Sequence, residues 1–210
     1  MKQKNHAATI IDILNELFPS PEIPLRHSNP FTLLIAVLLS AQCTDARVNQ
    51  ITPHLFSKAD TPEKMMKLSV LEIEEIIRPC GIYKNKAKAI WGLSKILVEN
   101  FDSQVPEDLP SLESLPGVGH KTASVVLIEA FSKPAFPVDT HIHRCAQRWQ
   151  LSDGKNVKKT EEDLKKLFPK ENWAKIHLQV IYYARQYCPA RGHKEENCPI
   201  CKFIHLNKKI

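Results

Sequence analysis

The sequence predicts an all-α protein, and three observations support this fold class. Apolar residues recur at helical spacing through most of the chain, as in residues 8–18 and 84–99. Residues that favour helix starts precede several of these segments. No run of alternating polar and apolar residues indicates a strand. The chain has 210 residues, enough for one large domain or two small ones.

Prolines and capping residues divide the chain into its expected helices. Thr61-Pro62 is typical of a helix start, because threonine caps a helix and proline is tolerated at the first helical position. Ser69 and Glu72 have the spacing of a capping box. Helices with both ends expected cover residues 8–18, 45–56, 84–99, 111–115, 121–131, 160–168 and 172–187. Further helices are expected to begin at residues 31, 62, 70 and 140.

Charge and composition restrict the class of partner and the compartment. A net charge of +6 favours a polyanionic partner such as nucleic acid. The longest apolar run, residues 31–41, is too short to span a bilayer, and residues 1–6 lead into an amphipathic stretch rather than the apolar region of a signal peptide. We therefore expect a cytoplasmic protein with no membrane partner. In that reducing compartment Cys43, Cys80 and Cys145 are expected to be small buried residues rather than disulfide partners.

A glycine turn, Leu115-Pro116-Gly117-Val118-Gly119-His120-Lys121, is the most specific motif. Gly117 and Gly119 can adopt backbone angles closed to other residues and allow close approach. Free N–H groups at such a turn and at the next helix start form an anion site that suits a DNA phosphate. The alternative, a plain corner joining two core helices, stays open.

Lys121 and Asp139 are the candidate catalytic pair. Lys121 lies in the first turn of the expected helix, where the helix dipole disfavours a cation. Partial burial would act in the same direction and leave the neutral amine that attacks carbon; a solvated or phosphate-binding lysine is the alternative. Asp139 is expected to cap a helix beginning at Thr140, which does not exclude catalysis. His141 and His143 are two residues apart and point away from each other on a helix, so they predict no metal pair.

The segments LPGVGHKTASVVL and VDTHIHR resemble the helix-hairpin-helix and catalytic loop of the endonuclease III family of DNA glycosylases. Residues 33–50 and 81–90 are also similar to that family, and only about the last 20 residues depart from it. The resemblance implies two helical domains flanking a DNA-binding cleft. Residues 22–132 would form a six-helix domain with the hairpin, and residues 1–21 with 133–210 the second domain, which carries the C-terminal cysteines.

The resemblance implies a bifunctional DNA glycosylase and AP lyase that removes oxidised pyrimidines in base-excision repair. Lys121 would attack the sugar and form a Schiff base, and Asp139 would deprotonate Lys121 or stabilise positive charge on the sugar. The partner would be double-stranded DNA with damaged bases or abasic sites, bound by a monomer that is nucleoid-associated in a bacterium. Two alternatives remain: a non-catalytic helix-hairpin-helix DNA-binding protein, and a monofunctional glycosylase for another lesion.

The resemblance also assigns roles in DNA binding. Gln42 would enter the duplex near the vacated space, and Ile82 would be the apolar wedge that parts base steps, with core packing as its alternative. Gly117 and Gly119 would hold the phosphate, and Glu113 resembles an acidic residue near the family's site. Residues 39–43 lack the early glutamate of the adenine-mismatch branch, which favours the pyrimidine-lesion branch.

The C-terminal cysteines have the spacing of a metal site. Cys188, Cys198 and Cys201 have the spacing C-x9-C-x2-C. The resemblance implies a 4Fe–4S cluster held by four cysteines spaced C-x6-C-x2-C-x5-C, but here the first gap is longer and Asn207 occupies the fourth position. His193 or His205 is a candidate fourth ligand, and three thiolates with His193 would suit structural zinc. The sequence leaves a 4Fe–4S cluster, zinc and no metal as alternatives.

Overall fold

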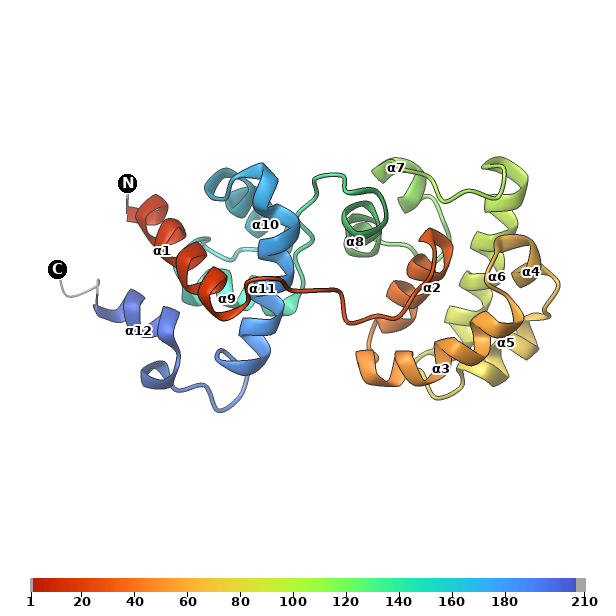
Figure 1. Ribbon diagram of the computed structural model, residues 1–210, viewed down its shortest axis with the longest axis horizontal. Coiled ribbons are helices and arrows are strands. Elements are labelled where there is room, and N and C mark those ends of the chain that lie inside the picture. The colour runs from red at the N-terminus through yellow and green to blue at the C-terminus, as the bar shows by residue number, and fades with distance from the viewer. Residues whose placement is uncertain (1, 207–210) are drawn as a thin grey trace. The chain divides into compact units, whose positions relative to one another are not determined.

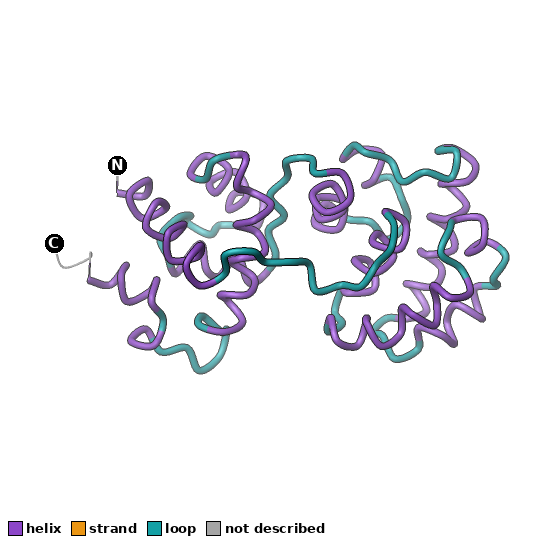
Figure 2. Tube along the Cα trace, in the orientation of Figure 1, coloured by secondary structure: helices purple, strands orange, loops and turns teal. Residues whose placement is uncertain are grey.

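The computed structural model describes residues 2–206, and these form helices and loops without a strand (Figure 1, Figure 2). This confirms the all-α prediction. The α-helices are α1 (Lys2–Leu17), α2 (Pro30–Ser40), α3 (Asp45–Lys58), α4 (Pro62–Met66), α5 (Val70–Ile77), α6 (Tyr83–Asn100), α7 (Leu109–Glu113), α8 (His120–Phe131), α9 (Thr140–Arg148), α10 (Val157–Leu167), α11 (Trp173–Gln186) and α12 (Pro199–Leu206). Two short 3-10 helices are η1 (Lys170–Asn172) and η2 (Glu195–Asn197).

The chain divides into two compact units. We call Pro24–Lys133 the inserted unit, and Met1–Ile23 with Pro134–Ile210 the terminal unit. These bounds lie close to the expected domain bounds, 22–132 and 1–21 with 133–210, and the division into those two domains stays a prediction. The inserted unit contains seven α-helices, α2 to α8, where the resemblance implied six. Two of the seven, α4 and α7, have only five residues each, and a side chain caps the N-terminus of each.

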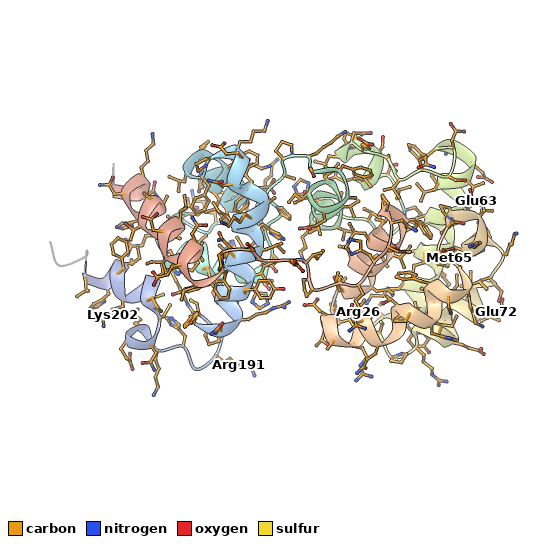
Figure 3. The ribbon with its side chains drawn as sticks, viewed as in Figure 1. Arg26, Glu63, Met65, Glu72, Arg191 and Lys202 are labelled. Atoms are coloured by element: carbon orange, nitrogen blue, oxygen red, sulfur yellow. The ribbon has the colours of Figure 1, made fainter. Side chains whose placement is uncertain are left out.

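The inserted unit is built around α2, which packs against α3, α6 and α8. Every residue from Phe31 to Leu39 is buried, because this helix is apolar on all sides and needs partners on all of them. Asn29 and Thr32 form a capping box at its start, with Pro30 at the first position. Met65 of α4 is fully buried in the same unit (Figure 3).

Two predicted helix starts are confirmed in the inserted unit. The Thr61 side chain accepts a hydrogen bond from the Lys64 N–H, ahead of Pro62. Ser69 and Glu72 form a capping box at the start of α5, in which the Ser69 N–H donates to Glu72 Oε2 at 2.7 Å. These short polar motifs act within one turn, so the sequence alone specifies them.

The terminal unit has its own core, in which α11 packs against α9 and α1, and α1 also contacts α12 (Figure 1). Trp149 and Tyr183 meet edge to face at the centre, with ring centroids 5.4 Å apart. The sequence did not predict α12. An eight-residue helix is too short to be stable alone, so α12 is stabilised by the packing of Ile200 and Ile204 in the core.

Smaller differences from the sequence prediction lie at helix ends. Helix α7 spans Leu109–Glu113 rather than 111–115, because the Asp108 side chain accepts from the Ser111 N–H and starts the helix earlier. Helix α10 likewise begins at Val157, because Asn156 caps it. Among residues 2–206, no helix combines the length and hydropathy needed to cross a bilayer.

Candidate active site and metal centre

The hairpin that joins α7 to α8 depends on Gly117. Its φ angle is +77°, a left-handed conformation that side chains rarely adopt. A Cβ atom there would lie 2.7 Å from Ala89 Cβ and 3.1 Å from Leu38 Cδ1. Leu115 and Val118 on either side are buried. The hairpin therefore packs its backbone directly onto α2 and α6, which is the close approach that the sequence predicted for Gly117.

Gly119 has a different role, because it is the N-cap of α8. Its backbone is extended, and a Cβ atom there would meet nothing within 4 Å. The N-cap residue has no side chain that could accept a hydrogen bond from the start of α8, so this helix lacks the usual side-chain cap. An exposed helix start of this kind binds anions through its N–H groups and its dipole.

Replacement of Gly117 by alanine should lower the free energy of unfolding by about 2–3 kcal/mol, from backbone strain and overpacking against Ala89. The matched control is Gly119→Ala, which meets no neighbouring atom and should cost less than about 1 kcal/mol as a poorer cap. Urea unfolding of both variants measures the difference. Equal losses in the two variants would contradict the packing role of Gly117.

Lys121 lies in the first turn of α8 and its side chain is exposed. The structure thus places Lys121 at a helix start, as predicted, but does not bury its side chain. The neighbouring His120 Nδ1 lies 2.7 Å from Glu113 Oε1, a contact that links the end of α7 to the start of α8. Glu113 thus lies on the hairpin itself, directly before the glycine turn.

Asp139 is the N-cap of α9, which confirms the predicted helix start at Thr140. Its Oδ1 atom accepts hydrogen bonds from the His141 and Ile142 N–H groups, both at 2.9 Å. Within residues 2–206 no donor reaches Oδ2. The residue is half-buried and follows the buried Val138, so the carboxylate has one anchored oxygen and one that is available for chemistry.

His141 and His143 have separate partners, as their spacing predicted. The His141 ring lies 3.2 Å from the Arg144 guanidinium. His143 Nδ1 lies 2.8 Å from the Thr160 hydroxyl. The two rings therefore serve different contacts within the terminal unit.

Gln42 and Ile82 lie in one surface hollow of the inserted unit. Both residues have left-handed backbones, with φ angles of +54° and +57°. Such strain in a non-glycine residue gathers at functional positions. The hollow measures about 200 Å³ and is also lined by Gly117. Ile82 is 50% exposed, which argues against its alternative role in core packing. Three predicted DNA-binding residues, far apart in sequence, therefore share one surface.

Lys86 holds this surface in place, although no sequence pattern distinguished it from Lys84 and Lys88. Its buried ammonium group donates hydrogen bonds to the Leu39 carbonyl at 2.9 Å and the Ala41 carbonyl at 2.7 Å. Burial lowers the pKa of Lys86. The contacts satisfy carbonyl groups at the C-terminal end of α2, directly before Gln42.

Nearby glycine and cysteine residues add to this support. A Cβ atom on Gly81 would lie 3.0 Å from the Gln42 carbonyl oxygen, so the backbones of the two loops approach closely. Cys80 and Cys145 are buried as predicted, whereas Cys43 is only half-buried because it belongs to the exposed Gln42 loop. Burial and the neighbouring Cys43 thiol raise the pKa of Cys80 to about 11.

With the wedge role that the resemblance implies, replacement of Ile82 by alanine should lower the rate of base excision about 10-fold, because a smaller side chain is a poorer wedge against stacked bases. The free energy of unfolding should change by less than about 1 kcal/mol, since the side chain is half exposed. Leu71→Ala is the matched control, because Leu71 is 70% exposed in the same unit. Similar excision rates for the two variants would contradict a wedge role.

The structure gathers four metal-ligating side chains in the terminal unit: Cys188, His193, Cys198 and Cys201. Their donor atoms all lie within 4.8 Å of one another, and the Cys188 and Cys201 sulfurs are 3.9 Å apart. His205 is not in this group, because its ring is exposed and lies 3.3 Å from Glu195 Oε2. Asn207, the position of the family's fourth cysteine, lies outside the described residues.

Two side chains that the sequence did not single out support these ligands. Arg148 Nη1 donates to Cys188 Sγ at 3.2 Å and to the Pro189 carbonyl at 2.8 Å. The buried Tyr183 hydroxyl lies 3.3 Å from Cys198 Sγ and accepts from the Ile200 N–H. Hydrogen bonds from the thiols of Cys145, Cys198 and Cys201, together with Arg148, lower the pKa of Cys188 and favour its thiolate. The group is thus compatible with binding a metal.

The all-helical fold, the glycine hairpin and the basic charge together define a helix-hairpin-helix protein of the DNA-repair class. Residues 35–170 match the family model described as HhH-GPD superfamily base excision DNA repair protein. The chain is 41% identical to endonuclease III of Bacillus subtilis, over 95% of this chain and 91% of that protein. It is 43% identical to endonuclease III of Escherichia coli K12, over 96% of this chain and 95% of that protein.

Solved structures agree with these relatives. A trapped endonuclease III–DNA covalent intermediate matches with a TM-score of 0.90 and 41% identity, covering 94% of this chain and 93% of the other. A non-covalent endonuclease III–DNA complex matches with a TM-score of 0.91 and 39% identity, covering 99% of each chain. The chain belongs to the endonuclease III family of this superfamily.

Proposed function

We propose that this protein is a bifunctional DNA glycosylase and AP lyase that removes oxidised pyrimidines from duplex DNA in base-excision repair. The observation that carries the proposal is the position of Lys121, exposed in the first turn of α8 directly after the uncapped glycine hairpin. A primary amine is thereby held next to a site for a backbone phosphate. A relative at 41% identity has been trapped as a covalent intermediate with DNA, which supports covalent chemistry here.

Binding would use the backbone of the hairpin and the surface around Ile82. The N–H groups after Gly119 would hold a phosphate and position the duplex without reading its sequence. Ile82 would enter between base steps, and Gln42 would occupy the space that the flipped nucleotide leaves. The net charge of +6 would add affinity for any duplex and make binding sensitive to salt.

The chemistry would begin at the Lys121 amine. Neutral Nζ attacks C1′ of the flipped nucleotide, and the bond from C1′ to the base breaks as the base leaves with the electron pair. Opening of the sugar gives an imine between Nζ and C1′. Loss of a C2′ proton then expels the 3′ phosphate and nicks the strand, and water hydrolyses the imine to release the enzyme. Asp139 would accept the Lys121 proton or stabilise positive charge on the sugar through its available Oδ2.

The substrate is accordingly double-stranded DNA that carries damaged bases or abasic sites. Action as a monomer and a cytoplasmic, nucleoid-associated location remain predictions. Cys188, Cys198 and Cys201 would hold a metal that keeps α12 packed against the rest of the terminal unit and takes no part in the reaction. Of the occupants that the sequence left open, a 4Fe–4S cluster, zinc and no metal, the short separations between donor atoms favour a single ion.

Incubation with duplex DNA containing an oxidised pyrimidine or an abasic site, followed by borohydride, tests the proposal. Borohydride reduces the imine, so a covalent protein–DNA adduct together with release of the damaged base supports the bifunctional enzyme. Base release without an adduct would indicate a monofunctional glycosylase. Binding without base release or adduct would indicate a non-catalytic DNA-binding protein.

A further inference from the structure

We propose that Cys188, His193, Cys198 and Cys201 bind one tetrahedral Zn²⁺ ion, with His193 as the fourth ligand, in place of the four-iron cluster that the resemblance implies. The donor set is three sulfurs and one imidazole nitrogen, all within the terminal unit. Sulfur and imidazole donors in a set of four are typical of closed structural zinc sites. This assignment does not depend on the glycosylase activity.

The distances favour a single ion. Zinc bonds of about 2.3 Å to sulfur and 2.0 Å to nitrogen place tetrahedral ligand atoms about 3.5–3.8 Å apart. Here the Cys188 and Cys201 sulfurs are 3.9 Å apart, and no pair among the four donors exceeds 4.8 Å. A 4Fe–4S cluster binds each thiolate to a different iron, with bridging sulfides between the irons, so its ligands must stand farther apart. The cluster also takes four thiolates, and this group supplies three.

His193 has the properties of a ligand. Its Nε2 atom is buried and has no hydrogen-bond partner among the described residues. A buried polar atom without a partner is rare and calls for a missing one, which a metal ion would supply. Gly192 has a φ angle of +69°, and this left-handed backbone turns the loop immediately before His193. His205 is exposed and lies beside Glu195, so it does not compete for the position.

The surroundings match the charge of such a site. Three thiolates, a neutral imidazole and Zn²⁺ carry a net charge of −1. The Arg148 guanidinium, which donates to Cys188 Sγ, compensates this charge. The Tyr183 hydroxyl accepts from the Ile200 N–H, which leaves its own proton for Cys198 Sγ. Hydrogen bonds of this kind orient thiolate ligands around a metal.

The site would fasten the C-terminal helix. Cys188 follows α11, while Cys198 and Cys201 flank the start of α12. One ion bound by these three cysteines would therefore link the end of α11 to the start of α12. The exposed residues Arg191 and Lys202 lie in the loop and on the helix that the ion would hold (Figure 3). Zinc has no redox chemistry, so the ion itself would hold the tail without changing its oxidation state, unlike the irons of an iron–sulfur cluster.

Metal analysis of the full-length protein tests this inference. Cells are grown with added iron and the protein is purified without oxygen, so that an iron–sulfur cluster would survive. We expect about one zinc per chain and no visible absorption band. We also expect Co²⁺ exchanged into the site to give the visible bands of a tetrahedral ion with three sulfur ligands and one nitrogen ligand. About four irons with labile sulfide per chain, or protein without metal, would overturn the proposal.

Three variants test the role of His193. His193→Ala should reduce the zinc content at least about fivefold, whereas His205→Ala should leave it unchanged. His193→Cys supplies a fourth sulfur and should keep both zinc and fold, while the Co²⁺ bands shift to those of a four-sulfur site. Full zinc content in His193→Ala, or identical Co²⁺ spectra for His193→Cys and the unaltered protein, would remove His193 from the ligand set.

Discussion

The Lys121→Gln variant should form no borohydride-trapped adduct with abasic DNA, and its strand nicking should fall by at least about 10³-fold. Glutamine keeps most of the length and polarity of lysine but has no amine to form the imine. Because the side chain is exposed, the substitution should leave the fold intact. Affinity for abasic duplex should stay within about 10-fold, because the hairpin backbone still holds the phosphate. Gel separation of the reduced products and a binding titration measure the two effects.

A second lysine substitution distinguishes the effect of losing the attacking amine from the effect of losing one positive charge. Lys95 on α6 is also exposed and lies 3.7 Å from Glu99, within the same unit. Lys95→Gln removes the same single charge and should trap and nick DNA at the rate of the unaltered protein. An adduct of normal yield in Lys121→Gln would mean that another amine attacks the sugar.

The Asp139→Asn variant should lose activity about 10²-fold while keeping its stability within about 1 kcal/mol. Asparagine caps a helix as well as aspartate does, so α9 keeps the hydrogen bonds from His141 and Ile142. The amide cannot accept a proton from Lys121 or balance positive charge on the sugar. Single-turnover excision kinetics and urea unfolding of the same preparation give both readouts.

Asp139→Ala provides the matched comparison. It removes the carboxylate and the cap together, so it should lose as much activity as Asp139→Asn and cost about 1 kcal/mol more in stability. If Asp139→Asn retains full activity, Asp139 is only a helix cap. If the two variants differ in activity but not in stability, the capping bonds do not contribute as the structure indicates.

The local features of the fold were predictable from sequence. The capping box of Ser69 and Glu72 and the cap at Asp139 involve atoms within one helical turn, so their sequence patterns are sufficient. The apolar character of residues 31–39 likewise required a helix that is buried on all sides. Helix α12 was missed, because its stability comes from docking rather than from its own residues.

The environment of each site residue was not predictable in the same way. The sequence left the exposure of Lys121 open, because the neighbours of a side chain determine its exposure and sequence spacing does not specify them. Ile82 had two open interpretations until the structure placed it, half exposed, in a hollow beside Gln42. The support from Lys86 depends on a contact between residues far apart in sequence.

The sequence by itself determined the helical class, the glycine hairpin, the identity of the candidate nucleophile and the number of tail cysteines, because each is a matter of residue type at short spacing. Only the tertiary structure decided which distant residues meet. It brought His193 within 4.8 Å of three sulfurs and placed Gln42, Ile82 and Gly117 on one surface. The physical reason is that ligand geometry and burial arise from packing between segments, and many sequences with the same local pattern could pack in different ways.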